Sequence, residues 1–190
     1  MQDQRRVRGA AFLKSVEENL TRYAAYHRDR RNIATHFVGI PMIVFSVVLA
    51  LEVVAIIVNG WTVSAAAVVS ILAAAYYLKQ DWAMGLAMAV VLFLMCAAGS
   101  EIEPRLGTGA TLGTAAFFFV LGWALQFLGH KYEGMKPAFF DDVMGLAVGP
   151  LFVCAEVFFY FGAHPALQRY IEERVGPTVA RRVHAGSTAS

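Results

Sequence analysis

Charged side chains are almost absent from three long stretches of the sequence, residues 36–100, 106–130 and 143–171. The exceptions within them are Glu52, Lys79, Asp81, Glu156 and Arg169. Hydrophobic residues make up 58% of the 190 residues, which is more apolar surface than a soluble core of this length can bury. One helical span of a bilayer needs about 20 predominantly apolar residues. The sequence therefore predicts an all-α, polytopic membrane helix bundle.

Four to five apolar segments are expected in this bundle, preceded by an amphipathic helix. Apolar side chains recur every three to four residues over 12–28, which is typical of a helix that lies at the membrane surface or packs on the bundle. The apolar segments are 37–58, 62–78, 82–98, 113–129 and 143–161, with loops at 101–109 and 131–142. Gly149-Pro150 and Glu156 interrupt the last segment, which favours a broken or re-entrant helix there.

The apolar segments leave no room for a separate soluble domain. We expect one membrane-embedded catalytic domain over 1–175, whose basic amphipathic arm, 1–35, carries part of the site. Residues 176–190 follow Gly176-Pro177 and end in small and polar residues, so they are expected to form a loosely ordered tail.

Basic residues are concentrated at the beginning of the chain. Eight of the sixteen Lys and Arg residues lie within 1–31, which predicts a cytosolic N-terminus and contact with anionic lipid headgroups. A complete fifth span would place the four arginines after Gly162 outside, so we expect the C-terminus to return to the cytosol. The net charge of +2 does not indicate a nucleic-acid partner. The expected location is a bacterial inner membrane or the endoplasmic reticulum, with the active site on the cytosolic side.

Three of the five histidines lie at segment ends that this topology places on one side of the membrane. His36 opens the first segment, His130 closes the fourth, and His27 lies in the arm. Three imidazoles on one face favour a metal site, because imidazole is the commonest metal ligand in proteins. His27 and His36 are nine residues apart, half a turn out of phase, so they can share a metal only if the helix breaks between them. Asp29 or Asn32 could cap a new helix there.

Polar side chains accompany these histidines at helical spacing. Asn32 precedes His36 by four residues, and Gln126 and Glu133 share a helix face with His130. Ligating histidines need a carboxylate or an amide that fixes their tautomer. Glu133 and Gln126 suit that role, and Glu133 could instead be a ligand itself.

Glu156 is the other conspicuous polar group. A carboxylate in an apolar segment is costly in lipid, so it must face the bundle interior and have a partner there. We therefore count Glu156 among the candidate functional residues.

Three motifs resemble those of a known membrane family. Residues 27–41 follow the pattern H-x4-N-x3-H-x2-G-x-P. Residues 126–133, QFLGHKYE, followed by Pro137-Ala138, and residues 149–156, GPLFVCAE, match a second and a third element in the same order. The motifs cover most of the chain, and they are similar to those of the 2-hydroxy fatty acid dioxygenase family, typified by a fungal endoplasmic reticulum enzyme.

This resemblance implies an Fe(II)-dependent, O2-consuming enzyme that shortens long-chain 2-hydroxy fatty acids by one carbon. It implies His27, His36 and His130 as the iron ligands, with Asn32, Glu133 and Glu156 as supporting catalytic groups. An imidazole-rich site with open positions suits Fe(II), which can bind a 2-hydroxy carboxylate by two oxygens with O2 beside it. The acyl chain would lie in the apolar bundle. Arg28 or Arg31 could attract the carboxylate, and Gln126 is a further candidate for substrate binding.

Two other classes of function stay open. A three-histidine, zinc-dependent membrane lipid hydrolase would cleave an amide without O2, so metal identity and O2 uptake distinguish it. A non-enzymatic membrane scaffold or small transporter would need no metal, and the sequence has no inverted repeat typical of transporters. A membrane di-iron hydroxylase is excluded, because it needs more histidines than the five present.

Overall fold

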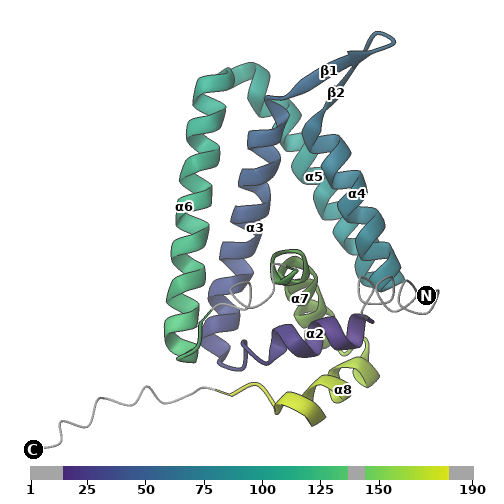
Figure 1. Cartoon of the computed structure of the whole chain (residues 1–190), viewed down its shortest axis with the longest axis vertical. Helices are drawn as coiled ribbons and strands as arrows, with labels where there is room; N and C mark the ends of the chain where they lie inside the picture. The colour runs from purple at the N-terminus through teal and green to yellow at the C-terminus, as the bar shows by residue number, and fades with distance from the viewer. Residues whose placement is uncertain (1–14, 137–143, 180–190) are drawn as a thin grey trace, which may run out of the picture.

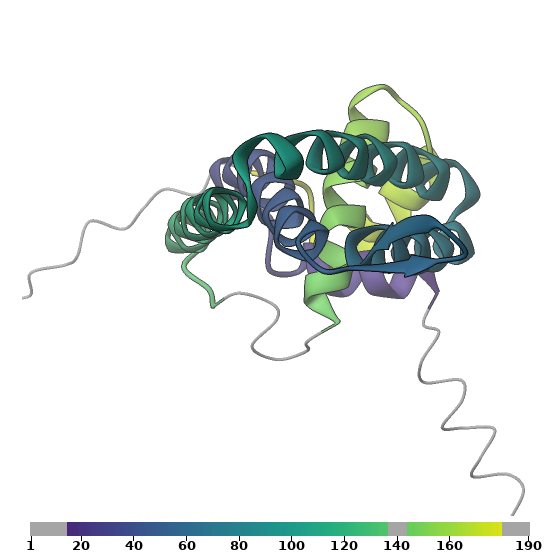
Figure 2. The same ribbon diagram turned by 90° about the horizontal axis from the view of Figure 1, so that it is seen from above.

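The computed structural model describes residues 15–136 and 144–179, and within them the predicted all-α bundle is confirmed. The predictions for the start of the arm, for part of loop 131–142 and for residues 180–190 lie outside the described residues. Four helices follow the long axis of the molecule in Figure 1: α3 (Arg30–Glu52), α4 (Ala65–Gln80), α5 (Trp82–Leu106) and α6 (Thr108–Glu133). Helices α2 (Val16–Ala24) and α8 (Pro165–Val175) lie across one end, and α7 (Gly145–Tyr160) crosses the bundle (Figure 2).

The amphipathic helix predicted over 12–28 is shorter than expected at its C-terminal end. Helix α2 begins after Ser15, whose hydroxyl accepts a hydrogen bond from the Glu18 amide, and it ends at Ala24. A new helix, α3, begins after Asp29, whose carboxylate accepts a hydrogen bond from the Arg31 amide at 2.9 Å. The chain therefore breaks between His27 and His36, which is the condition for the two imidazoles to meet.

A β-hairpin takes the place of the end of the first apolar segment and the start of the second. Strands β1 (Ala55–Val58) and β2 (Trp61–Ser64) pair antiparallel around Asn59-Gly60, whose φ values of 50° and 82° are those of a type I′ turn. The segment boundaries at 58 and 62 were therefore wrong. An Asn-Gly dipeptide between β-branched and aromatic residues favours a hairpin, and the Ser64 hydroxyl then caps α4.

The predicted loop 101–109 is largely helical, which corrects the sequence analysis. Helix α5 continues to Leu106, and the single residue Gly107, with φ 75°, joins it to α6. Pro104 removes one backbone hydrogen bond from the last turn. An exposed ion pair of 2.6 Å between Arg105 and Glu101, four residues apart, spans the same turn.

Helices α3 and α6 form the most extensive helix pair of the described bundle. A Cβ atom on Gly122 would stand 2.9 Å from the backbone oxygen of Gly39 and 2.7 Å from the Ile43 side chain. A Cβ atom on Gly129 would collide with the side chains of Thr35 and Asn32. Small residues therefore let the two backbones approach closely. This close packing brings the first turns of α3 against the last turns of α6.

A break follows the last apolar segment, but not where the sequence analysis expected it, because α7 runs through Gly149-Pro150 and Glu156 as one helix. Helices α7 and α8 meet at 113°, and Gly162 and His164 in the break have positive φ values of 74° and 54°. Within the described residues, three helices are long and apolar enough to cross a membrane, or four if the bent pair counts as one span. Apolar side chains on the outer surface, such as Phe93 with 70% exposed, fit contact with lipid. These features are those of an integral membrane protein.

Candidate metal centre

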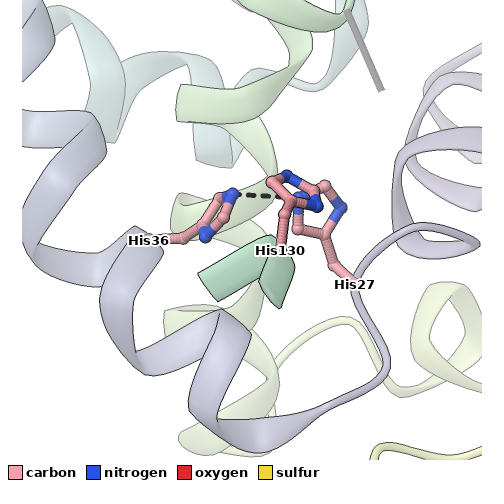
Figure 3. A group of neighbouring side chains, drawn as sticks. All are labelled: His27, His36 and His130. Atoms are coloured by element: carbon pink, nitrogen blue, oxygen red, sulfur yellow. Dashed lines mark hydrogen bonds between the residues drawn. The ribbon is translucent and has the colours of Figure 1, made fainter. Parts of the chain in front are cut away.

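Three imidazoles meet where α3 and α6 approach the segment after α2 (Figure 3). His27 comes from that segment, His36 from the second turn of α3, and His130 from the last turn of α6. One nitrogen of each ring lies within 4.8 Å of the others, and the three residues are 0%, 1% and 6% exposed. The structure therefore brings together the three histidines that the sequence analysis singled out.

The hydrogen bonds of two rings determine which nitrogen is free to bind a metal. The Nδ1 atom of His27 donates to the Tyr23 carbonyl at 2.7 Å, and that of His36 donates to the Asn32 carbonyl at 2.9 Å. Because a carbonyl can only accept, each Nδ1 carries the hydrogen and each Nε2 keeps its lone pair. These two Nε2 atoms face one another at 3.0 Å. Two lone pairs at this distance repel unless a cation lies between or beside them.

A metal ion fits this donor set better than a proton does. Burial and the neighbouring His36 lower the pKa of His27 well below its ordinary value, so the imidazole stays neutral and able to ligate. Imidazole nitrogens that bind one metal ion lie about 2.0–2.1 Å from it, so any two of them are at most about 4.2 Å apart. The 3.0 Å between the two Nε2 atoms is within this limit, and the third nitrogen, within 4.8 Å of the others, would need only a small shift. The three residues thus offer a buried, neutral, all-imidazole site.

Aromatic rings hold His27 in its orientation. Its imidazole is stacked on the Tyr23 ring, with centroids 4.1 Å apart and planes 4° apart, and Phe152 of α7 packs at 5.5 Å. Burial raises the pKa of the Tyr23 phenol, so its hydroxyl stays protonated. Sequence analysis did not single out Tyr23 as a site residue, although it lies four residues before His27, the spacing that brings two side chains of one helix together.

Glu133 joins the last turn of α6 to the segment that carries His27. Its Oε2 atom accepts hydrogen bonds from the amides of Arg28 at 3.0 Å and Asp29 at 2.7 Å, and from the Asn32 side chain at 3.2 Å. The Asn32 amide also donates to the Tyr26 carbonyl at 3.1 Å. A single buried carboxylate oxygen therefore organises the break between α2 and α3.

The Arg28 side chain is 4% exposed and contacts mainly backbone. Its Nε atom donates to the carbonyls of Ala24 and His27, and its Nη1 atom to that of Gly176 at 3.0 Å. The chain near Gly176 is also tied to this segment directly, because the Val179 amide donates to the Arg28 carbonyl at 2.8 Å. Arg28 thus links the His27 segment to the end of α8.

Glu156 is paired with Arg28 and does not belong to the imidazole cluster. Its Oε1 atom is 3.9 Å from Nη2 of Arg28, and it lines a separate cavity with Arg30 and Glu172. Arg31 is turned toward other partners: its guanidinium forms a forked pair with Asp29, at 3.0 and 2.7 Å, and lies over the Tyr132 ring. Of the residues proposed from sequence, these two and the Arg28 guanidinium are the groups that the structure does not place beside the cluster.

A small cavity of about 60 Å³ adjoins His36 and His130. Tyr23 and Gln126 complete its polar end, and Ile40, Ile43, Val44 and Trp123 line it further along α3 and α6. Gln126 is 5% exposed, and its Nε2 atom has no hydrogen-bond partner among the residues that the structure describes. Residues 137–143, whose placement is not described, follow α6. The cavity is thus polar beside the imidazoles and apolar toward the middle of the helices.

Comparison with known proteins gives two matches. Residues 13–161 match the model of the family described as "2-hydroxy-palmitic acid dioxygenase Mpo1-like". The chain is also similar to the 2-hydroxy-palmitic acid dioxygenase MPO1 of Saccharomyces cerevisiae (strain ATCC 204508 / S288c), with 31% identity over 162 residues that cover 84% of this chain and 89% of the yeast protein. No solved structure gives a significant match.

Proposed function

The chain belongs to the Mpo1-like family, and on that premise we propose that it is an Fe(II)-dependent dioxygenase that shortens long-chain 2-hydroxy fatty acids by one carbon. The observation that carries the proposal is the pair of His27 and His36 Nε2 atoms facing one another at 3.0 Å, both with their Nδ1 hydrogens donated to carbonyls. With His130 they form a buried set of three imidazole donors.

In this proposal the three imidazoles hold iron, and the bound Fe(II) supplies the activation of O2. The overall reaction balances without a cosubstrate: a 2-hydroxy acid and O2 give the acid one carbon shorter, CO2 and water. All four electrons that reduce O2 come from the substrate. The enzyme therefore needs neither 2-oxoglutarate nor another reductant in each turnover. The chain's own task is to bind the substrate, orient it and exclude water.

The cavity supports a substrate with a polar head and an apolar tail. Its volume of about 60 Å³ is small beside the roughly 300–1,000 Å³ that enclose a drug-sized ligand, so it suits the reacting head group alone. We place the head group at His36, His130 and Gln126. The acyl chain would continue along Ile43 and Val44, toward the lipid-facing middle of the bundle.

The remaining candidates take supporting roles in this proposal. Asn32 and Glu133 position His36 and the His27 segment through the hydrogen bonds described above. Glu156 compensates the buried charge of Arg28. Arg28 and Arg31 make their hydrogen bonds with carbonyl oxygens and with Asp29, so in this proposal they contact no substrate atom and would attract an anionic substrate only through long-range potential, which Glu156 and Asp29 reduce.

We place the metal centre at the cytosolic face of the membrane. The start of α3, the turn between α4 and α5 and the end of α6 lie at one end of the molecule (Figure 1). These positions carry Arg28, Arg30, Arg31, Lys79, Lys131 and Lys136. An excess of Lys and Arg in short connections favours the cytosolic side. The centre would therefore receive substrate from the cytosolic leaflet.

Metal analysis of the detergent-purified protein, combined with O2 uptake and product analysis, tests this function. We expect bound iron, O2-dependent conversion of 2-hydroxypalmitate and no conversion of palmitate. Shorter 2-hydroxy acids should bind more weakly, by up to about 0.8 kcal/mol for each buried methylene that is lost. Bound zinc with O2-independent hydrolysis of a lipid amide, or equal turnover of palmitate, would contradict the proposal.

A further inference from the structure

The phenol hydroxyl of Tyr23 is a group beside the metal centre to which the proposed function gives no role. The backbone carbonyl of Tyr23 accepts the Nδ1 hydrogen of His27, and the phenol ring of Tyr23 is stacked on the same imidazole. The same side chain lines the cavity beside His36 and His130. The carbonyl and the ring of Tyr23 thus contact His27, whereas its hydroxyl is available to a molecule in the cavity.

Gly149 of α7 shows where this hydroxyl lies. A Cβ atom on Gly149 would stand 2.9 Å from the Tyr23 hydroxyl oxygen and 3.2 Å from the end of the Ile40 side chain. Both Gly149 and Ile40 line the cavity. Among the described residues no hydrogen bond to this hydroxyl is found. A glycine in α7 therefore leaves space for a hydrogen-bond donor at the cavity wall.

Gln126 supplies a second donor from another helix. Its Nε2 atom lies against Gly39, where a Cβ atom would collide with it, and it has no partner in the described part of the chain. The described lining of the cavity includes no Lys or Arg. An anionic head group that enters this cavity therefore meets two neutral donors. Hydrogen bonds to a charged acceptor are about twice as strong as those between neutral groups.

We propose that the Tyr23 hydroxyl and the Gln126 amide donate hydrogen bonds to the substrate carboxylate, and that Tyr23 is the residue that selects a free acid over an ester. This inference rests on the proposed function for the identity of the substrate. It adds a substrate-binding residue, the atom that it contacts and a reason for the glycine at position 149. A methyl ester would keep the 2-hydroxyl and the acyl chain but lose the charge that strengthens both hydrogen bonds.

The test compares 2-hydroxypalmitate with its methyl ester, bound to the metal-loaded full-length protein without O2. Quenching of Trp123 fluorescence reports binding, since this side chain lines the cavity, and the Trp123→Phe variant supplies the background. We expect Tyr23→Phe to retain its metal. The ratio of its affinities for the acid and the methyl ester should fall about 10-fold. Gly149→Ala, which keeps the phenol but crowds its hydroxyl, should lower the same preference.

Tyr77→Phe is the matched control, because it also removes a buried phenol hydroxyl. That hydroxyl donates to the Ala147 carbonyl at 3.0 Å and lies outside the cavity lining, so the acid preference should not change. An unchanged preference in Tyr23→Phe would overturn the inference. Loss of metal in Tyr23→Phe would also overturn it, since the hydroxyl would then act through His27.

The two proposals fail separately in this design. If the wild-type protein prefers the acid but converts none when O2 is admitted, the proposed reaction fails and the carboxylate site stands. If the wild-type protein binds acid and ester equally, the carboxylate site fails, whatever the turnover.

Discussion

In the proposed metal centre each imidazole would contribute one nitrogen, so removing any one would leave two ligands. We predict that His27→Ala, His36→Ala and His130→Ala each deplete the bound metal, as measured by elemental analysis of the purified variants. His164→Ala is the control, because His164 lies in the break between α7 and α8, 3.7 Å from Asp81, and outside the cluster. Full metal occupancy in all three cluster variants would refute the ligand assignment.

Glu133 should act on the metal through the segment that carries His27. The Glu133→Gln variant keeps the size of the side chain but loses the charge that accepts three hydrogen bonds from this segment and Asn32. We expect metal affinity to fall about 10–100-fold, the usual effect of removing a group that orients a ligand. A competition titration with a chelator measures this change.

The control for this prediction is Glu101→Gln. Glu101 forms an exposed ion pair with Arg105 at the end of α5, so its loss should leave the metal affinity unchanged. Equal affinity in Glu133→Gln and the wild type would show that the carboxylate does not orient the site.

The packing of α3 on α6 determines whether His36 and His130 can meet. Gly122→Ala would push a Cβ atom against Ile43 and the Gly39 carbonyl, so we expect a lower melting temperature together with a lower metal content. Gly113→Ala on the same helix has nothing within 4 Å and should be neutral or stabilising by about 0.5–1 kcal/mol. Thermal unfolding in detergent with parallel metal analysis compares the two. Equal behaviour of both variants would contradict the role of the close approach.

Patterns with a clear physical basis could be predicted from the sequence. Charge-free segments predicted the bundle, and Asp29 was one of the two residues considered as a cap after the break that lets His27 reach His36. The turn at Asn59-Gly60 was available as a hairpin signal, but the apolar residues around it were assigned to membrane segments. Pro104 and two glycines suggested a loop over 101–109, but Pro104 lies in the last turn of α5 and Gly107 alone separates the two helices.

Contacts between segments that are far apart along the chain could not be predicted from the sequence. Nothing local indicates that Gly149 leaves room for the Tyr23 hydroxyl, or that Glu133 accepts the amides of Arg28 and Asp29. Such contacts depend on how α7 crosses the bundle and how closely α6 approaches α3. The single-domain organisation over 1–175 stays a prediction.

The molecule as a whole should sit in the membrane with the metal centre and α8 on the cytosolic side and the β-hairpin on the other. In a background with Cys96→Ala and Cys154→Ala, single cysteines at the exposed positions Glu173 in α8 and Thr62 in β2 report the two sides. A membrane-impermeant thiol reagent applied from outside should label Thr62→Cys and not Glu173→Cys. Labelling of both or the reverse pattern would mean that the topology is different.

The backbone contact between the His27 segment and Val179 has a consequence for biogenesis. The Arg30 amide donates to the Val179 carbonyl, and the Val179 amide donates to that of Arg28, so residues separated by most of the chain complete one small unit. The ribosome synthesises the segment with Arg28 and Arg30 early and Val179 late. The helices of the bundle are inserted into the membrane between these two events. The nascent chain therefore cannot complete the backbone contacts that surround the His27 segment until translation has passed Val179.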